Sequence, residues 1–268
     1  MKGFKVMQFI DIGINLMSSQ FNEDRHEIVQ NASKVSVSPM IITGCNLYDS
    51  TNASIFAAKY NGQLYSTAGI HPHNAKSCDD TTISKLENLC NLLHVVAVGE
   101  CGLDYDRDFS PRNLQRKWFE AQIELAKDKK MPLFLHERAA FDDFYNILTK
   151  HDKIGSNSVV HCFTGTKKEL EAYLSLGCYI GITGWICDER RGLHLRELIK
   201  LIPDNKLMIE TDAPYLMPRN LKPRPTSRRN EPAYLVHIAR EIAELKGITV
   251  EELSNITVSN TKKFFNLP

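Results

Sequence analysis

The sequence predicts an α/β fold, a (β/α)8 TIM barrel of the metal-dependent hydrolase type, and three observations predict it. Eight short apolar runs recur along the chain, with helical patterns between them. Each run is continuously apolar rather than alternating, which is typical of parallel strands buried on both faces. The chain has 268 residues, close to the roughly 250 residues of one such barrel.

The expected strands are short runs rich in Ile, Val, Leu and Phe. The first reads MQFIDIG and the last reads LMIETDAP. In chain order they cover residues 7–13, 39–44, 64–71, 95–102, 132–137, 158–163, 179–185 and 207–214.

The clearest helical pattern is an apolar face between residues 114 and 125, with the spacing i, i+4, i+7 and i+11 of an amphipathic helix. That face carries Leu114, Trp118, Ala121 and Leu125. Thr166 and Glu169 are spaced as a capping box, which predicts that a helix begins after Thr166. Further helices are expected at residues 23–34, 49–60, 81–93, 141–150, 167–176, 193–201, 232–245 and 250–265.

A doubly wound open sheet is the alternative fold, and it usually carries a glycine-rich first turn. The turn after the first expected strand reads GINLMSS, and neither GxGxxG nor GxxxxGK[ST] occurs in the chain. No linker divides the sequence, so we expect residues 1–268 to form a single TIM-barrel domain.

Composition and charge restrict the functional classes. The formal net charge is +1, so a nucleic-acid partner must be held by a local basic patch. The seven cysteines form no CxxC pair, which is typical of a reducing cytosol. Asp11 interrupts the first apolar run without a following cleavage site, and no run approaches the ~20 residues that span a bilayer. We therefore expect a cytoplasmic monomer without a membrane partner.

Polar side chains of metal-binding types close most of the expected strands. They include Asp11 with Asn15, His71 with His73, Glu100, His136, His161 and Asp212. Each one alone is more typical of a structural role, such as a helix cap. Because the C-terminal ends of barrel strands converge on one axis, however, the last four are expected to meet. Two imidazoles and two carboxylates at one point form a divalent-metal site.

Eight strings, in this order and spacing, resemble the TatD family of metal-dependent deoxyribonucleases. They are FIDIGINL, STAGIHPH, VAVGECGLDY, HCFTG, YIGITGW, CDERRG, LMIETDAPYL and SRRNEPAYL. The resemblance implies a phosphodiester hydrolase, a 3′–5′ exonuclease on single-stranded DNA with RNA as a second substrate. By position, it implies metal and catalytic roles for Glu100, His136, His161 and Asp212, and it places His71 near the scissile phosphate.

The first strand departs from the pattern of most TatD relatives. Most carry Asp-x-His-x-His there, and the two histidines bind a buried metal, whereas Gly13 and Asn15 stand at those places here. Loss of two nitrogen ligands leaves a site richer in carboxylate and water oxygen, which suits Mg²⁺ or Mn²⁺ better than Zn²⁺. We therefore expect a weakly bound divalent metal, with Mg²⁺ favoured and Mn²⁺ or Zn²⁺ as alternatives.

The hypothesis for catalysis assigns three roles. Glu100 binds the metal within the catalytic centre, and Asp212 orients or deprotonates the attacking water. His71 and Arg138 are candidates for offsetting the charge that develops on the phosphoryl oxygens.

A basic segment, PRNLKPRPTSRRNEP, follows the strand that ends near Asp212. Its cations are Arg219, Lys222, Arg224, Arg228 and Arg229, and no acid precedes Glu231. Because loops after the last strands of a TIM barrel often bind phosphate, we expect Arg228 and Arg229 to contact the substrate, with a solvated loop as the alternative.

Arg190 and Arg191 would add to the same basic rim unless they pair with Asp188 or Glu189. Candidates for stacking on bases are Tyr105, Phe163, Trp185 and Tyr215.

Two other functions stay open. One is a metal-dependent amidohydrolase acting on a small cyclic amide, a class that commonly uses His-x-His on strand one and a carboxylated lysine. The other is a non-catalytic nucleic-acid-binding barrel, in which Gly13 and Asn15 would be signs of a decayed metal site.

Cys101 and Cys162 are expected to be small packing residues, because no base that would activate either thiol is evident.

Overall fold

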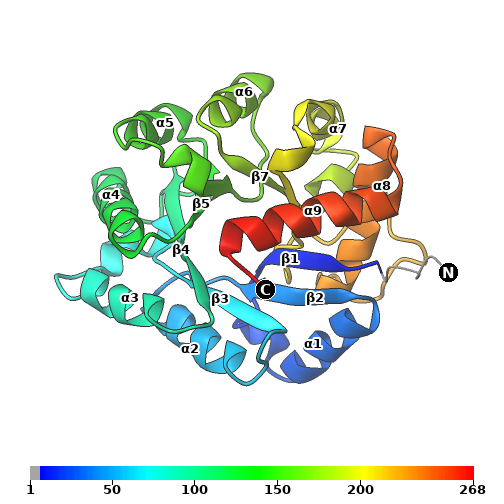
Figure 1. Cartoon of the computed structure of the whole chain (residues 1–268), viewed down its shortest axis with the longest axis horizontal. Helices are drawn as coiled ribbons and strands as arrows, with labels where there is room; N and C mark the ends of the chain where they lie inside the picture. Colours follow the sequence, from blue (N-terminus) through cyan, green and yellow to red (C-terminus); the bar gives the residue numbers. More distant parts are fainter. Residues whose placement is uncertain (1–6) are drawn as a thin grey trace.

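Eight parallel strands form a ring surrounded by helices in the computed structural model, which describes residues 7–268 (Figure 1). Each strand pairs in parallel with the next one along the chain, in the order β1 to β8. The strands are β1 Phe9–Ile14, β2 Val37–Ile42, β3 Leu64–Ala68, β4 Val95–Asp104, β5 Leu133–Arg138, β6 Ser158–Val160, β7 Tyr179–Ile182 and β8 Leu207–Ile209. The predicted (β/α)8 barrel is confirmed.

The helices lie close to their predicted positions. They are α1 Arg25–Lys34, α2 Leu47–Ala57, α3 Thr82–Cys90, α4 Arg112–Lys129, α5 Phe141–Thr149, α6 Lys167–Ser175, α7 Leu193–Leu198, α8 Leu235–Lys246 and α9 Val250–Phe265. The predicted capping box of Thr166 and Glu169 begins α6. The segment expected to be helical from residue 193 to 201 is a short α-helix that tightens into a 3-10 turn at Ile199–Leu201.

The barrel closes between β8 and β1 through backbone and side-chain hydrogen bonds. Asn15 N donates to the Ala213 carbonyl at 2.7 Å, and Asp212 N donates to the Gly13 carbonyl at 2.9 Å. Within this seam, Asp11 accepts from Thr211 N at 3.0 Å and from Thr211 Oγ1 at 2.5 Å. Burial raises the pKa of Asp11 to about 8. Asp11 therefore fastens the first strand to the segment after the last one.

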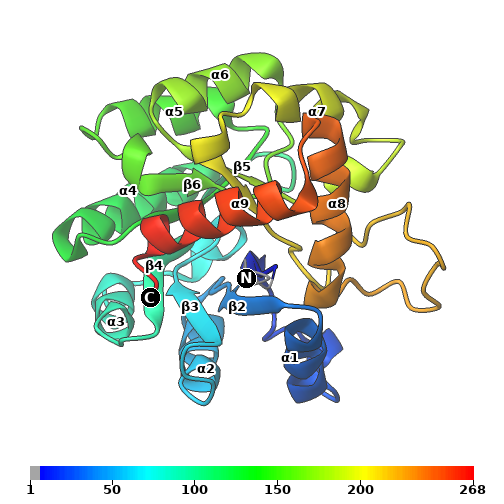
Figure 2. The same ribbon diagram turned by 45° about the vertical axis from the view of Figure 1, so that its right-hand side comes forward.

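Helix α9 covers the N-terminal end of the barrel (Figures 1 and 2). Phe264 packs on Tyr179 at the start of β7, with ring centroids 5.0 Å apart. Asn260 donates to the carbonyl of Leu207, at the start of β8. The barrel interior at this end is filled by Ile12, Ile41, Ala97, Phe134, Val159, Tyr179, Met208, Phe264 and Phe265. Among the described residues, the barrel interior is therefore open at the opposite end, where the strands end.

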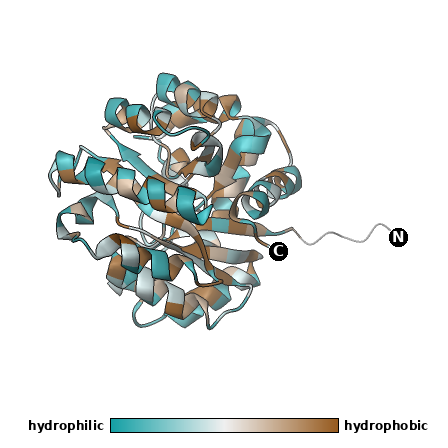
Figure 3. Ribbon diagram, turned by 60° about the vertical axis from the view of Figure 1, so that its left-hand side comes forward, coloured by the Kyte–Doolittle hydropathy of each residue, from teal (hydrophilic) through white to brown (hydrophobic). Residues whose placement is uncertain are grey.

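A second, larger core lies between the strands and the surrounding helices. Figure 3 shows the helices with hydrophobic and hydrophilic residues mixed along their length, as one buried face and one exposed face require. Among residues 7–268, no helix combines the length and apolar character needed to cross a membrane.

Candidate active site

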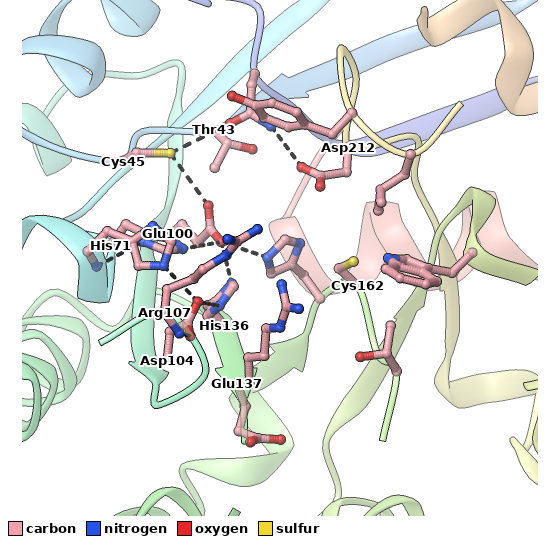
Figure 4. A pocket seen from close by; sticks show the side chains of 18 of the residues that line it. Thr43, Cys45, His71, Glu100, Asp104, Arg107, His136, Glu137, Cys162 and Asp212 are labelled. Atoms are coloured by element: carbon pink, nitrogen blue, oxygen red, sulfur yellow. Dashed lines mark hydrogen bonds and ion pairs between the residues drawn. The ribbon is translucent and has the colours of Figure 1, made fainter. Parts of the chain in front are cut away.

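A cavity of about 860 Å³ opens where the strands end (Figure 4). All four predicted metal-site residues and His71 line it. The polar lining also includes Asn15, Thr43, Cys45, Asp49, His73, Asp104, Arg107, Glu137, Arg138 and Arg191. Residues from distant parts of the sequence are therefore brought to one point at the C-terminal end of the barrel.

Glu100 reaches the centre of this cavity because β4 is irregular around it. The pairing of β4 with β5 shifts register between Gly99 and Cys101. Gly99 and Gly102 have φ values of +141° and +148°, which favour glycine. A Cβ atom at Gly102 would lie 1.8 Å from the His136 carbonyl oxygen. The two glycines therefore permit the bulge that presents the Glu100 carboxylate.

Three imidazoles converge on one oxygen of this carboxylate. Glu100 Oε1 lies 2.7 Å from His161 Nε2, 2.9 Å from His136 Nδ1 and 3.4 Å from His71 Nε2. Burial alone would raise the pKa of Glu100, but the neighbouring imidazoles outweigh burial and hold the pKa well below its ordinary value. Glu100 is therefore an ionised carboxylate despite being buried.

Glu210, which the sequence reasoning missed, holds His161 from the other side. Its Oε2 atom lies 3.3 Å from His161 Nδ1, and its Oε1 atom accepts from Cys162 N at 2.5 Å. This contact gives the Nδ1 proton an acceptor, so Nε2 is the ring nitrogen that faces Glu100 and the cavity. The available signal was the i, i+2 spacing of Glu210 and Asp212, which would put both on one face of the expected strand 207–214, although β8 itself ends at Ile209.

Gly13 and Gly181 make room for the Glu210 carboxylate. A Cβ atom at Gly13 would lie 2.4 Å from Glu210 Oε2, and one at Gly181 would lie 2.6 Å from Oε1. Gly13, singled out from the sequence, thus borders a buried carboxylate.

Asp104 was also missed, and it bridges two imidazoles. Its Oδ2 atom lies 2.7 Å from His73 Nε2 and 3.4 Å from His136 Nε2. Burial would raise the pKa of Asp104, but the nearby imidazoles of His136 and His73 hold it below its ordinary range. Asp104 follows Glu100 by four residues in the same strand, so the period-2 pattern was again the available signal.

Asp212 is oriented by Asn15, the second residue that stands in place of a strand-one histidine. Asn15 Nδ2 donates to Asp212 Oδ1 at 2.7 Å. Cys45 Sγ lies 3.6 Å from Asn15 Oδ1 and 3.5 Å from Glu100 Oε2, so these side chains form a chain across the cavity (Figure 4). Burial raises the pKa of Asp212 to about 7, with Glu100 adding to the rise and His161 opposing it.

The donor set fits a divalent metal. Ligand atoms of His71, Glu100 and His136 lie within 4.8 Å of one another. His136 Nε2 is buried without a hydrogen-bond partner of good geometry among the described residues. Imidazole nitrogen with carboxylate oxygen is a donor set used for several divalent ions.

The predicted cations fall into different environments. Arg138 lines the cavity, where its Nη2 atom lies 2.9 Å from Asp106 Oδ2 in a pair whose side chains are each almost half exposed. Arg191 also lines the cavity, with its guanidinium 5.7 Å from the ring centroid of Trp185. Arg190 instead pairs with Asp188 at 3.1 Å, which confirms the alternative given for it.

The geometry does not support the substrate-contact prediction for Arg229. Its guanidinium lies against Asp24 Oδ2 at 2.5 Å and Glu231 Oε1 at 2.9 Å. Neither Arg228 nor Arg229 is among the described residues that line the cavity. Arg229 is already neutralised and ties the basic segment to the start of α1, whereas the exposed Arg228 remains a prediction.

The aromatic residues predicted to stack on bases also lie in different environments. Trp185 and Tyr215 line the cavity, and Tyr215 is 52% exposed. Phe163 is buried in the core, and Tyr105 donates to Asp143 at 2.6 Å while Arg112 lies over its ring.

The two cysteines singled out from the sequence differ in position. Cys101 is buried, whereas Cys162 borders the cavity. Burial raises the pKa of both thiols, which supports packing roles.

Comparisons with known proteins cover almost the whole chain. A family model described as TatD related DNase matches residues 10–266. The chain is 48% identical over 258 residues to the 3′-5′ ssDNA/RNA exonuclease TatD of Erwinia billingiae, covering 96% of this chain and 99% of that protein.

Solved structures give the same picture. The TatD homolog YJJV of Escherichia coli matches with a TM-score of 0.89 at 27% identity, covering 98% of this chain and 99% of that one. A hydrolase TatD family protein of Entamoeba histolytica matches with a TM-score of 0.87 at 30% identity, covering 96% and 98%.

Proposed function

This chain belongs to the TatD family of DNases, and on that premise we propose that it is a metal-dependent 3′–5′ exonuclease acting on single-stranded DNA and on RNA. The relative from Erwinia billingiae, named for this activity, aligns over nearly its full length. The observation that carries the proposal is the convergence of Glu100, three histidines and Asp212 in one open cavity. We further propose that the protein acts as a monomer.

We assign the metal to Glu100, His136, His161 and Asp212, and we favour Mg²⁺ because two of the four donors are carboxylates. The bound ion would supply positive charge to the phosphoryl group and make a water molecule more acidic. Glu210 and Asp104 would fix the imidazole orientations of His161 and His136, since each carboxylate faces the ring nitrogen turned away from Glu100.

His71 lies in the cluster of possible metal ligands, but its hydrogen bonding favours a role as a donor to substrate. Its Nδ1 atom accepts from His73 N at 3.1 Å, so the ring proton sits on Nε2. Burial, the largest effect, lowers the pKa of His71 to about 4, which keeps the ring neutral. A neutral ring with Nε2–H facing Glu100 can donate to a phosphoryl oxygen in the cavity.

Asp212 is the proposed general base. Asn15 occupies Oδ1, so Oδ2 is left to accept a proton from the attacking water. Arg138 would exchange its exposed pair with Asp106 for a substrate phosphate, because such exposed pairs contribute little to stability.

The test follows product length on 3′-labelled and 5′-labelled single strands, with and without Mg²⁺. Asp212→Asn should reduce the rate roughly 100-fold or more, the scale of losing a general base. Asp128→Asn, which alters an exposed carboxylate on α4, is the matched control. Near-normal activity of Asp212→Asn would reject the assignment to Asp212.

The other functions have their own readout. Turnover of hydantoin or dihydroorotate without cleavage of the strand would favour an amidohydrolase. Binding of the strand without cleavage, with Mg²⁺ and Mn²⁺ both supplied, would favour a non-catalytic barrel. The curated relatives, named as exonucleases, weigh against both.

A further inference from the structure

A second cavity, of about 250 Å³, lies on the outward side of α2. Its lining residues are Met17, Asn22, Arg25, Tyr48, Asn52, Ile55, Phe56 and Lys59. Residues 48, 52, 55 and 59 have the spacing i, i+4, i+7 and i+11, so one face of α2, continued just past its end, forms a wall.

The charge of this second cavity is positive. Arg25 and Lys59 line it, and no carboxylate does among the described residues. Arg25 is positioned by two neutral acceptors, because its Nε atom donates to the Leu16 carbonyl at 2.7 Å and its Nη2 atom donates to Asn22 Oδ1 at 2.8 Å. Within residues 7–268, neither cation lies in an ion pair. Both charges are therefore available to an anionic ligand.

The same wall exposes apolar side chains beside these cations. Tyr48 is 77% exposed and Ile55 is 55% exposed. An exposed aromatic ring next to uncompensated cations is the combination that single-stranded nucleic acid uses, since bases stack on the ring and phosphates contact the cations.

The second cavity adjoins the active site. Met17 lines both cavities. Asp49, the residue after Tyr48, lines the active-site cavity. Arg229 bonds to the Gln20 carbonyl and Asp24, which brings the basic segment to the start of α1 beside Arg25. A strand leaving the active site past Met17 thus meets cations and an aromatic ring in succession.

We propose that this cavity is a second subsite that binds the single strand upstream, on the 5′ side, of the nucleotide being removed. The inference rests on the proposed function. A base stacks on Tyr48, and the flanking phosphates contact Arg25 and Lys59. The subsite adds affinity for long strands and takes no part in bond cleavage.

The test compares Tyr48→Ala and Lys59→Ala with the wild type on two substrates. One is a dinucleotide, too short to leave the active-site cavity, and the other is a strand long enough to span both cavities. Exposed residues on or just after α3 provide matched controls, Leu93→Ala for the apolar change and Lys85→Ala for the charge. Fluorescence anisotropy with the long strand in EDTA measures binding without cleavage.

Tyr48→Ala should raise KM and the anisotropy Kd for the long strand about tenfold, within the range for losing one base stack. Its kcat, and both constants for the dinucleotide, should stay at wild-type values. Unchanged long-strand binding in both variants would overturn the inference, as would equal losses on both substrates or a change in oligomeric state showing that this face joins two copies. A wild type that binds the strand but does not cut it would reject the proposed function and leave the subsite standing.

Discussion

Glu210→Gln is the sharpest test of how the candidate metal site is organised. The substitution keeps the size of a fully buried side chain, but it replaces one acceptor oxygen by an NH2 donor. In the wild type both oxygens face nitrogen, because Cys162 N lies 2.5 Å from Oε1 and His161 Nδ1 lies 3.3 Å from Oε2. Because the two donors face different oxygens, the single glutamine oxygen can reach only one of them.

Either arrangement of the glutamine has a cost. If the amide nitrogen faces His161, the imidazole proton must move to Nε2, where it blocks the lone pair that would bind a metal. If the amide nitrogen faces Cys162, a buried N–H is left without an acceptor. An unsatisfied buried group costs about 1–3 kcal/mol, and loss of a carboxylate that orients a metal-binding histidine typically costs about 10–100-fold in metal affinity.

The assay titrates Mg²⁺ against cleavage of a single strand and, separately, measures unfolding by urea in EDTA. We expect the half-saturating Mg²⁺ concentration of Glu210→Gln to rise about 10–100-fold. Glu137→Gln is the matched control, since Glu137 borders the same cavity but accepts from Ala140 N and Tyr173 Oη instead of an imidazole. If both variants titrate like the wild type, Glu210 does not orient His161.

Three further predictions concern stability and charge. Arg229→Ala should lower the free energy of unfolding by about 1 kcal/mol, because it removes partly exposed ion pairs. It should leave cleavage of the dinucleotide unchanged. Arg228→Ala is the control and should leave the free energy of unfolding unchanged. Asp11→Ala should cost about 3 kcal/mol or more in urea unfolding, because it leaves buried donors in the barrel seam unsatisfied; a loss under about 1 kcal/mol would reject that role. The pKa of His161 is raised well above 6.5 by Glu100 and Glu210 against the opposing effect of burial, so in EDTA these pairs should stabilise the protein fully below pH 6.5 and progressively less as pH rises through the raised pKa. Glu210→Gln should show a smaller loss of unfolding free energy over that alkaline range, and an equal slope in both proteins would contradict the assignment.

The sequence by itself determined the barrel and the principal site residues. Continuous apolar runs separated by helical periodicity predict parallel strands buried on both faces, and this local pattern does not depend on distant contacts. Because the C-terminal ends of barrel strands converge, the sequence also predicts that Glu100, His136, His161 and Asp212 lie together, without any knowledge of their distances. The deviations lie at the ends of elements: several strands end earlier than expected, β8 at Ile209 instead of residue 214, and helices shift by up to three residues.

Only the tertiary structure decided which charges are free and which are paired. Glu100 and His161 are 61 residues apart, and Arg229 is 205 residues from Asp24, so neither contact follows from spacing along the chain. Glu210 and Asp104 occupy positions that sequence periodicity marks as inward, but periodicity does not say which imidazole each one meets. Charge compensation depends on the distance between side chains in space, and packing of the strands and loops sets that distance.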